Sequence, residues 1–240
     1  MKRTLRLFSF LIVVLFASCE QQGMKPCLKA DNDTLVKALK LENFSGVELS
    51  ADVDVYVSQG KDQSVSISGS KIILDALKID VSGGAISISS ERCFSDKTPN
   101  PKVFITIPQI TRLEVKGTGN IYSNTKLLCD IVEFKILGAG DIFVKTDAAK
   151  VITTLSGSGR ISLSGSANNH FIKLPGSGQI YAFGLETNDT DVDFNGWGTV
   201  EVFVQKNLNA KIRGTGDVRL KGYPVVRSEI SGEGKVVDTN

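Results

Sequence analysis

Two pairs of aspartates have the spacing at which carboxylates can act together on a glycosidic bond. Asp52 and Asp54 stand two residues apart, as do Asp191 and Asp193. On an extended strand this spacing puts both side chains on one face, roughly 6.5 to 7 Å apart at a rise of about 3.3 Å per residue. An inverting glycosidase holds its two carboxyl groups about 6.5 to 9.5 Å apart. The alternative is that these acids occupy the wet side of an amphipathic strand, a pattern that produces two-residue spacing very often.

Other catalytic chemistry has little support in the residue types. The chain has a single histidine, His170, which follows two asparagines and is predicted to lie in a loop. It contains neither Gly-x-Ser-x-Gly nor Cys-x-x-Cys. A nucleophilic triad needs a histidine beside its nucleophile, and a zinc site needs a cluster of histidines and cysteines. We therefore expect a protein that is not an enzyme and that has no metal and no cofactor.

The first 18 residues are typical of a lipoprotein signal peptide. A basic segment with Lys2, Arg3 and Arg6 precedes an apolar run, Leu7 to Phe16, that is too short to span a bilayer. The sequence Phe16-Ala17-Ser18-Cys19 resembles the bacterial lipobox, which implies cleavage before Cys19 and acylation of that residue. We expect a lipid anchor in the cell envelope, in the outer membrane, with the periplasmic or surface face left open. The alternative is an ordinary signal peptide with an incidental cysteine.

Charge excludes one class of partner. The signal peptide holds three of the 28 basic residues and none of the 26 acidic residues, so the remaining chain is nearly neutral. Proteins that bind nucleic acids rely on positive charge against the phosphates. We therefore expect no nucleic acid partner. The membrane, reached through the lipid anchor, and an envelope glycan or protein are the partners that remain.

The cysteines allow at most one bridge within the chain once Cys19 is assigned to lipid. Cys27 and Cys93 could pair in an oxidising compartment, and the sequence leaves this open. Cys129 lies in an apolar, strand-like stretch and is predicted to be a buried small hydrophobe.

The amino-terminal part of the chain has irregular signals. Residues 19–43 are polar and are predicted to form a lipidated tether with a short helix over Thr34 to Leu41. From Val47 to Val57 apolar and polar residues alternate, which predicts a half-buried strand. Lys71 to Ala76 suits one helical turn. Alternating runs on both sides of Ser82-Gly83-Gly84 predict a hairpin.

A glycine repeat dominates the rest of the chain. The pattern apolar-x-Gly-x-Gly-x-apolar occurs seven times, at 117/119, 138/140, 157/159, 176/178, 196/198, 214/216 and 232/234, and in most repeats a further apolar residue stands two positions earlier. A period of 18 to 21 residues is close to one coil of a β-solenoid. If each run stays extended, both glycines point inward, for a sharp bend or for a waist where facing backbones approach. We predict an all-β, right-handed parallel β-helix-like domain over residues 44–240, with irregular strands at its amino-terminal end.

Aromatic residues supply the main indication of a binding surface. Trp197, the only tryptophan, lies inside one of the glycine pairs, where the other repeats have small or polar residues. The period of two also points Tyr122, Phe143 and Tyr181 outward. Exposed rings can stack on sugars or anchor a partner protein. The alternative is that the strands bend at the glycines and that amino-terminal strands or a long loop cover these rings.

The opening Phe44-Ser45-Gly46-Val47-Glu48-Leu49-Ser50-Ala51-Asp52, the segment 102–108 and the repeated Gly-x-Gly-[Asp/Asn]-[Ile/Val] together carry a family resemblance. The block 44–240 resembles the auto-transporter adhesin head domain family, the GIN domain. Its members are typically secreted or lipidated proteins of Bacteroidetes. The resemblance implies a β-helix-like fold and brings no functional residues that could be transferred.

These observations favour a membrane-anchored lipoprotein of the cell envelope with a non-catalytic binding or adhesion role. Two alternatives stay open. One is a structural envelope module without a ligand site, and the other is a carboxylate-based enzyme that acts on polysaccharides.

Overall fold

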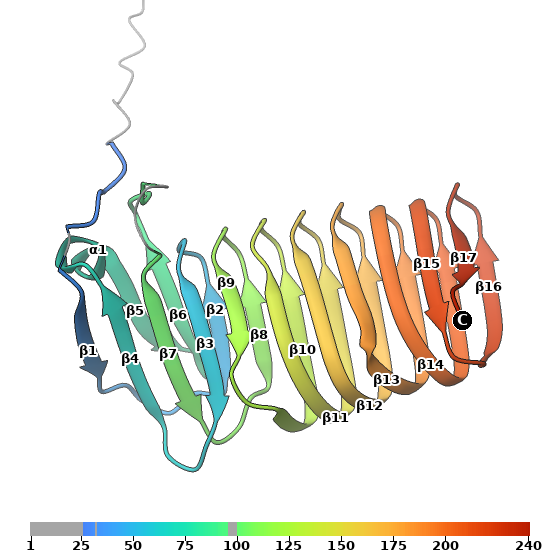
Figure 1. Ribbon diagram of the computed structural model, residues 1–240, viewed down its shortest axis with the longest axis horizontal. Helices are drawn as coiled ribbons and strands as arrows, with labels where there is room; N and C mark the ends of the chain where they lie inside the picture. The colour runs from blue at the N-terminus through green and yellow to red at the C-terminus, as the bar shows by residue number, and fades with distance from the viewer. Residues whose placement is uncertain (1–25, 32, 96–99) are drawn as a thin grey trace, which may run out of the picture.

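The protein is a flattened coil of β-strands, elongated along the direction in which its coils stack (Figure 1). A computed structural model describes residues 26–31, 33–95 and 100–240. In these residues 17 strands join one hydrogen-bonded sheet, which folds into two walls and forms a β-solenoid of about 7 turns. The predicted all-β solenoid is confirmed. Within the same residues, no helix is both long enough and apolar enough to cross a membrane.

The first wall runs from antiparallel strands at the amino-terminal end to a short strand at the carboxyl-terminal end. Its strands lie side by side in the order β5 (Leu77–Ser82), β6 (Ala85–Ser90), β2 (Gly46–Leu49), β8 (Arg112–Val115), β10 (Leu127–Ile136), the second halves of β11 (Ile142–Leu155), β12 (Arg160–Leu174), β13 (Gln179–Phe194) and β14 (Trp197–Ile212), and β16 (Val225–Ile230).

The second wall contains the other strand of each coil. Its order is β1 (Leu35–Leu39), β4 (Ser64–Gly69), β7 (Lys102–Ile107), β3 (Asp54–Gln59), β9 (Asn120–Ser123), the first halves of β11 to β14, β15 (Thr215–Lys221) and β17 (Lys235–Asp238). A regular coil therefore ascends the first wall, turns at a glycine pair, descends the second wall and bends back.

The core is built from columns that take one side chain from each coil. One column stands two residues before each glycine pair: Val115, Ile136, Leu155, Leu174, Phe194 and Ile212 are all fully buried. A second column stands two residues after each pair and is buried from Ile121 to Val218. Each such side chain stabilises the fold by about 1.5 to 3 kcal/mol relative to an exposed one. The alternation of the sequence thus becomes an apolar interior and a polar outer face.

The glycine pairs form the corners between the two walls. Each pair packs against the backbone carbonyl groups of the preceding coil. A Cβ on Gly157 would lie 1.8 Å from the Gly138 carbonyl oxygen, and one on Gly176 would lie 2.3 Å from that of Gly157. The predicted sharp bend at the glycines is confirmed, whereas the predicted waist between facing backbones is wrong. The missing side chain would point along the stack into the preceding coil, because the chain turns at the pair instead of staying extended across to the opposite wall.

At the amino-terminal end the coil order departs from the chain order. The pair β2 and β3 lies between the level of β6 and β7 and the level of β8 and β9. The single strand predicted from Val47 to Val57 is wrong, because residues 50–53 turn the corner between β2 and β3. Gly117 packs on this corner, where its Cβ would lie 2.2 Å from the Ser50 carbonyl oxygen.

Three local predictions have clear outcomes. The helical turn α1 (Lys71–Ala76) and the antiparallel hairpin β5–β6 are confirmed. The helix predicted over Thr34 to Leu41 is wrong, because Leu35–Leu39 form β1, antiparallel to β4. Leu35 and Leu39 have a helix-like spacing, but the open edge of β4 offers the backbone partners that a short isolated helix lacks.

A disulfide closes the amino-terminal end. Cys27 and Cys93 are bonded with their Cα atoms 4.7 Å apart, which settles the pairing that the sequence left open. The bridge is extended by backbone hydrogen bonds from Leu28 to Cys93 and from Ser95 to Leu28. Cys129 is free and half-buried, not fully buried as predicted. Its Sγ donates to the Ile110 carbonyl oxygen, and burial raises the pKa of its thiol.

We expect Gly157→Ala to lower the free energy of unfolding by about 1 to 3 kcal/mol, because the added Cβ overlaps a backbone oxygen that cannot move alone. Ser158→Ala is the matched control, since Ser158 is exposed at the same corner and its loss should change stability by less than about 0.5 kcal/mol. Urea unfolding followed by circular dichroism measures both. Equal stability of the two variants would contradict the corner contact.

Candidate functional site

The two aspartate pairs do not form isolated carboxylate pairs on one strand. Asp52 lies in the turn before β3, so it does not share an extended strand with Asp54. Asp54 accepts a hydrogen bond from the Asn120 amide at 3.0 Å. Asp191 accepts one from the Asn209 amide at 2.9 Å, and Asp193 pairs with Arg213 at 2.5 Å. These carboxylates therefore have partners on neighbouring coils.

His170 is a core residue. It lies within β12, not in the predicted loop, and is 1% exposed. Its Nε2 is 2.8 Å from the Thr153 hydroxyl oxygen, and burial lowers its pKa to about 3. Across the described ranges, no three histidine, cysteine or acidic side chains are grouped so that they could hold a metal ion.

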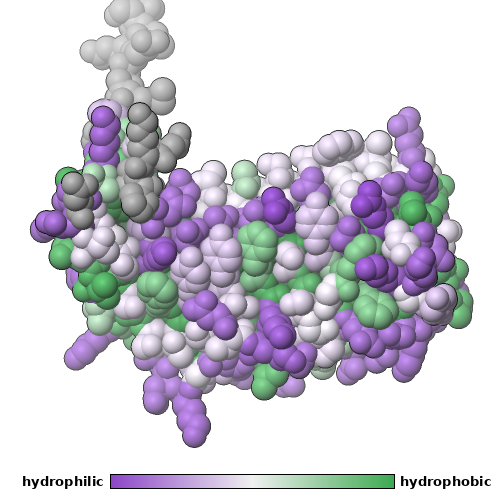
Figure 2. Space-filling model, in the orientation of Figure 1, coloured by the Kyte–Doolittle hydropathy of each residue, from purple (hydrophilic) through white to green (hydrophobic). Residues whose placement is uncertain are grey.

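Aromatic side chains form a stacked column on the outer face of the second wall. The rings of Phe104, Tyr56, Tyr122 and Phe143 follow one another with centroids 5.2 to 5.3 Å apart. They come from β7, β3, β9 and β11, which lie side by side. Burial, followed by the nearby Asp54 charge, raises the pKa of Tyr122. Figure 2 shows apolar patches among hydrophilic ones on this face.

The four aromatic residues singled out in the sequence do not form one cluster. Tyr122 and Phe143 stack on each other, but Ser162 separates Phe143 from Tyr181 along the column. Trp197 lies apart from the column, at a corner. The sequence did not indicate Tyr56 and Phe104, because their strands reach the column through pairings between segments far apart in the chain.

Trp197 is 60% exposed and stands at one end of a shallow surface along the corners, which we call the corner shelf. The shelf is lined by Leu137, Gly138, Ala139, Ser156, Gly157, Ser158, Pro175, Gly176, Ser177, Gly196 and Trp197. Its members are small or apolar, and none carries a charge. A floor of glycines brings the backbone close to the surface, so that the indole ring is the largest side chain on it.

The shelf is held rigidly by hydrogen bonds between successive corners. The N–H groups of Ala139, Ser158, Ser177 and Trp197 donate to glycine carbonyls of the preceding coil at 2.9 to 3.0 Å. Trp197 thus sits on the Gly176 carbonyl and begins β14. Because each corner is fixed to the next, the surface of the shelf is preorganised.

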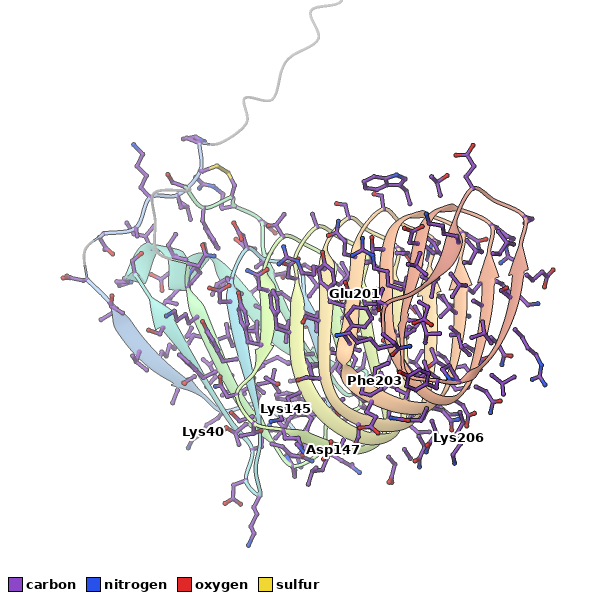
Figure 3. All side chains as sticks on the ribbon, turned by 45° about the vertical axis from the view of Figure 1, so that its right-hand side comes forward. Lys40, Lys145, Asp147, Glu201, Phe203 and Lys206 are labelled. Atoms are coloured by element: carbon purple, nitrogen blue, oxygen red, sulfur yellow. A yellow bond between two sulfur atoms is a disulfide. The ribbon has the colours of Figure 1, made fainter. Side chains whose placement is uncertain are left out.

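Charged groups lie beyond the shelf. On the first wall, Glu48 pairs with Lys116 at 2.7 Å and with Arg112 at 2.5 Å. The hydrogen bond from Lys116 lowers the pKa of the Glu48 carboxyl, and the same bond raises the pKa of Lys116. At the opposite bend, Lys145, Asp147 and Lys206 lie at the lower edge (Figure 3). The neutral shelf therefore contrasts with both its flank and the opposite edge.

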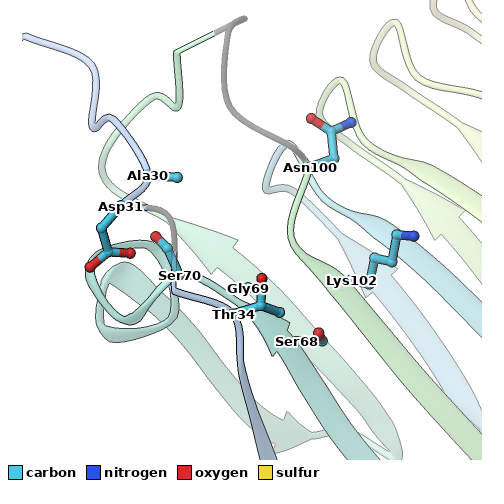
Figure 4. Close-up of a pocket in the computed structure, with 8 residues that line it drawn as sticks. All are labelled: Ala30, Asp31, Thr34, Ser68, Gly69, Ser70, Asn100 and Lys102. Atoms are coloured by element: carbon cyan, nitrogen blue, oxygen red, sulfur yellow. The ribbon is translucent and has the colours of Figure 1, made fainter.

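A second, polar cavity of about 200 Å³ lies at the amino-terminal end. Asp31, Ser70, Asn100 and Lys102 are among the residues that line it (Figure 4). Ser70 is 6% exposed, and its hydroxyl has no hydrogen-bond partner in the described part of the chain.

The two walls, the glycine corners and the absence of long helices from the described residues define a β-solenoid protein of repeated coils. The chain belongs to the family described as "putative auto-transporter adhesin, head GIN domain", which it matches over residues 43–224. No curated protein matches the sequence.

Solved structures share the fold. A putative adhesin from Bacteroides fragilis is 20% identical with a TM-score of 0.83, covering 88% of this chain and 100% of its own. A putative adhesin from Parabacteroides distasonis is 21% identical with a TM-score of 0.68, covering 89% and 100%. A protein from the same species, described as a putative lipid binding protein, is 18% identical with a TM-score of 0.70, covering 90% and 100%.

We expect His170 to make stability depend on acid. Its folded pKa is about 3, below the ordinary value of 6.5, so the unfolded chain takes up a proton that the folded chain excludes. This stability is complete above pH 6.5 and falls by about 1.4 kcal/mol per unit as the pH drops toward 3.

The measurement compares wild type with His170→Gln, whose amide does not titrate. Urea unfolding at pH 7.5, 6, 5 and 4 gives the difference in free energy, in which the common titration of the carboxylates cancels. If this difference in free energy stays constant across the pH range, the folded chain protonates His170 as readily as the unfolded chain does, and the expectation is wrong.

Proposed function

We propose that this protein is a lipid-anchored, non-catalytic binding protein of the cell envelope that takes a neutral glycan on the corner shelf. The observation that carries the proposal is Trp197, a ring with 60% exposure standing over a rigid shelf without charges. Indole rings stack on the apolar faces of sugars, and the hydroxyls of Ser156, Ser158 and Ser177 are suited to the sugar hydroxyls. The family and the putative adhesins that share the fold support a binding role.

A sugar can stack only on a ring face that is free, and this favours the corner shelf over the aromatic column as the primary contact. Tyr122 lies between Tyr56 and Phe143 in the stack, so its ring faces are already in contact. No other ring in the described residues stacks on Trp197. We therefore place the primary contact at Trp197, and give Tyr122, Phe143 and Tyr181 a secondary place as an outer surface that a long ligand or an envelope protein can reach.

The anchor belongs to the same proposal. Cys19 lies outside the described residues, and its assignment rests on the lipobox resemblance and the basic, apolar leader. The Cys27–Cys93 disulfide adds support, because such bonds persist in oxidising compartments such as the bacterial envelope. We propose an outer-membrane location. The partnered carboxylates of Asp54, Asp191 and Asp193 favour binding over glycan cleavage.

We expect Trp197→Ala to weaken binding to purified neutral envelope glycans by roughly tenfold or more, because the variant loses both the apolar area that the ring buries and a stacking contribution on the order of 1 kcal/mol. The thermal midpoint should barely change, because the ring is largely exposed. Tyr223→Ala is the matched control: Tyr223 is 87% exposed and does not line the shelf. Quenching of the single tryptophan's fluorescence on titration gives a direct readout in the wild type.

Three results would count against the shelf. Unchanged affinity in Trp197→Ala would place the site elsewhere. Binding to envelope proteins and to no glycan would replace the ligand class. No binding in any assay would favour the structural envelope module.

We expect Cys19→Ala to release the protein from membranes or to block its maturation, because the variant cannot be acylated at this position. Fractionation of cells with and without detergent measures the release, and Cys129→Ala serves as the matched cysteine control. A Cys19→Ala protein that is fully processed and membrane-bound would contradict the anchor. Protease treatment of intact cells then separates the surface face from the periplasmic face.

A further inference from the structure

The two ends of the solenoid are finished differently. At the amino-terminal end, α1 covers the core with Ile73 and Leu74, and the antiparallel strands β1, β4 and β5 close both walls. At the carboxyl-terminal end, every residue of β16 is exposed. Val225 is 60% exposed, Val226 42% and Ile230 46%.

Two of these exposed residues continue the buried core columns. Val226 and Ile230 are register partners of Leu208 and Ile212, which are fully buried one coil earlier. Ile230 is the seventh member of the column that stands two residues before each glycine pair. An apolar column that ends in water is the feature that solenoids ordinarily remove with a polar capping repeat.

The backbone of β16 also has a free edge. Its described pairing is with β14 alone, and the Ser231 N–H donates to the Ile212 carbonyl on that side. Because backbone groups alternate in direction, Val226, Ser228 and Ile230 direct their N–H and C=O groups toward the unpaired edge. Such an edge is a template for another strand.

We propose that this edge pairs antiparallel with β16 of a second copy of the chain, about a two-fold axis at Ser228. In that register Val226 lies opposite Ile230 of the partner subunit, which joins the two apolar columns. Arg227 lies opposite Glu229 of the partner subunit, so that opposite charges face each other on the outer side. A parallel, in-register pairing would instead place Arg227 against Arg227 of the partner subunit, and like charges opposite each other repel.

The two-fold register also limits the assembly to two copies. An isologous pairing occupies the free edge of β16 on both copies and therefore closes on itself. On the second wall, Asp238 is the register partner of the inward residue Leu220, so a charged side chain ends the apolar column there. The pairing between the two copies is therefore confined to the first wall. Glu229 pairs at 3.5 Å with Lys211, but both side chains are mostly exposed and this contact is weak enough to rearrange.

Cysteine cross-linking of the full chain, purified in mild detergent, tests the register. At a hydrogen-bonded antiparallel pair the Cα atoms are about 5.5 Å apart, within the range a disulfide bridges. We expect Ser228→Cys to form a disulfide-linked dimer on mild oxidation. Lys173→Cys is the control, since it is exposed on β12, away from the open end. Both are made in a Cys129→Ala background.

Charge exchange supplies the second readout, by sedimentation velocity. Arg227→Glu or Glu229→Arg alone should weaken association about tenfold, because two like-charged pairs then face each other, and the double variant should restore it. Circular dichroism checks that each variant is folded. No cross-linking above the Lys173→Cys control, cross-linking to a different protein, or a double variant as weak as the singles would overturn the proposal. None of these outcomes depends on glycan binding at the shelf.

Discussion

The contact between a glycine and the carbonyl group of the coil beneath it is the constraint on which the structure depends. Two walls can stay in register only if each corner stacks directly on the one before it, and a Cβ on Gly138 would come within 2.1 Å of the Gly117 carbonyl oxygen. The apolar columns, the ladders of both walls and the flat outer shelf follow from this spacing. The corners therefore both join the two walls and hold the exposed backbone of the shelf in place through hydrogen bonds to the preceding coil.

The regular coils were predictable because each repeat carries its own period, its own glycines and its own inward residues. The arrangement of the amino-terminal end was not predictable. There, β2 and β3 lie between strands that come later in the chain, and no local sequence pattern indicates that order. β1 shows the same limit. Most of its five residues are good helix formers, and pairing with the edge of β4 overrides that local preference.

The features of the candidate site were visible in the sequence only in part. Trp197 stood out because every other repeat has a small or polar residue in its place, and the structure leaves it exposed. Tyr56 and Phe104 could not be found, since their neighbours in the column are set by long-range pairing. His170 was misplaced because two asparagines before it suggest a loop, whereas the stacked coils carry them on the outer side of a strand and bury the imidazole against Thr153.

The disulfide also determines how the domain would carry a mechanical load. A pull on the chain ahead of Cys27 passes directly to Cys93 through the covalent bond. The segment between the two cysteines, whose sequence separation is 66, therefore carries none of the force. The force then enters the fold at Cys93, which lies between β6 and β7 in the sequence. The short edge strand β1 therefore bears none of it. While the bridge is oxidised, stretching the tether cannot peel the amino-terminal strands away one after another. Reduction would place those strands in series with the load and turn the stiff end of the domain into an extensible one.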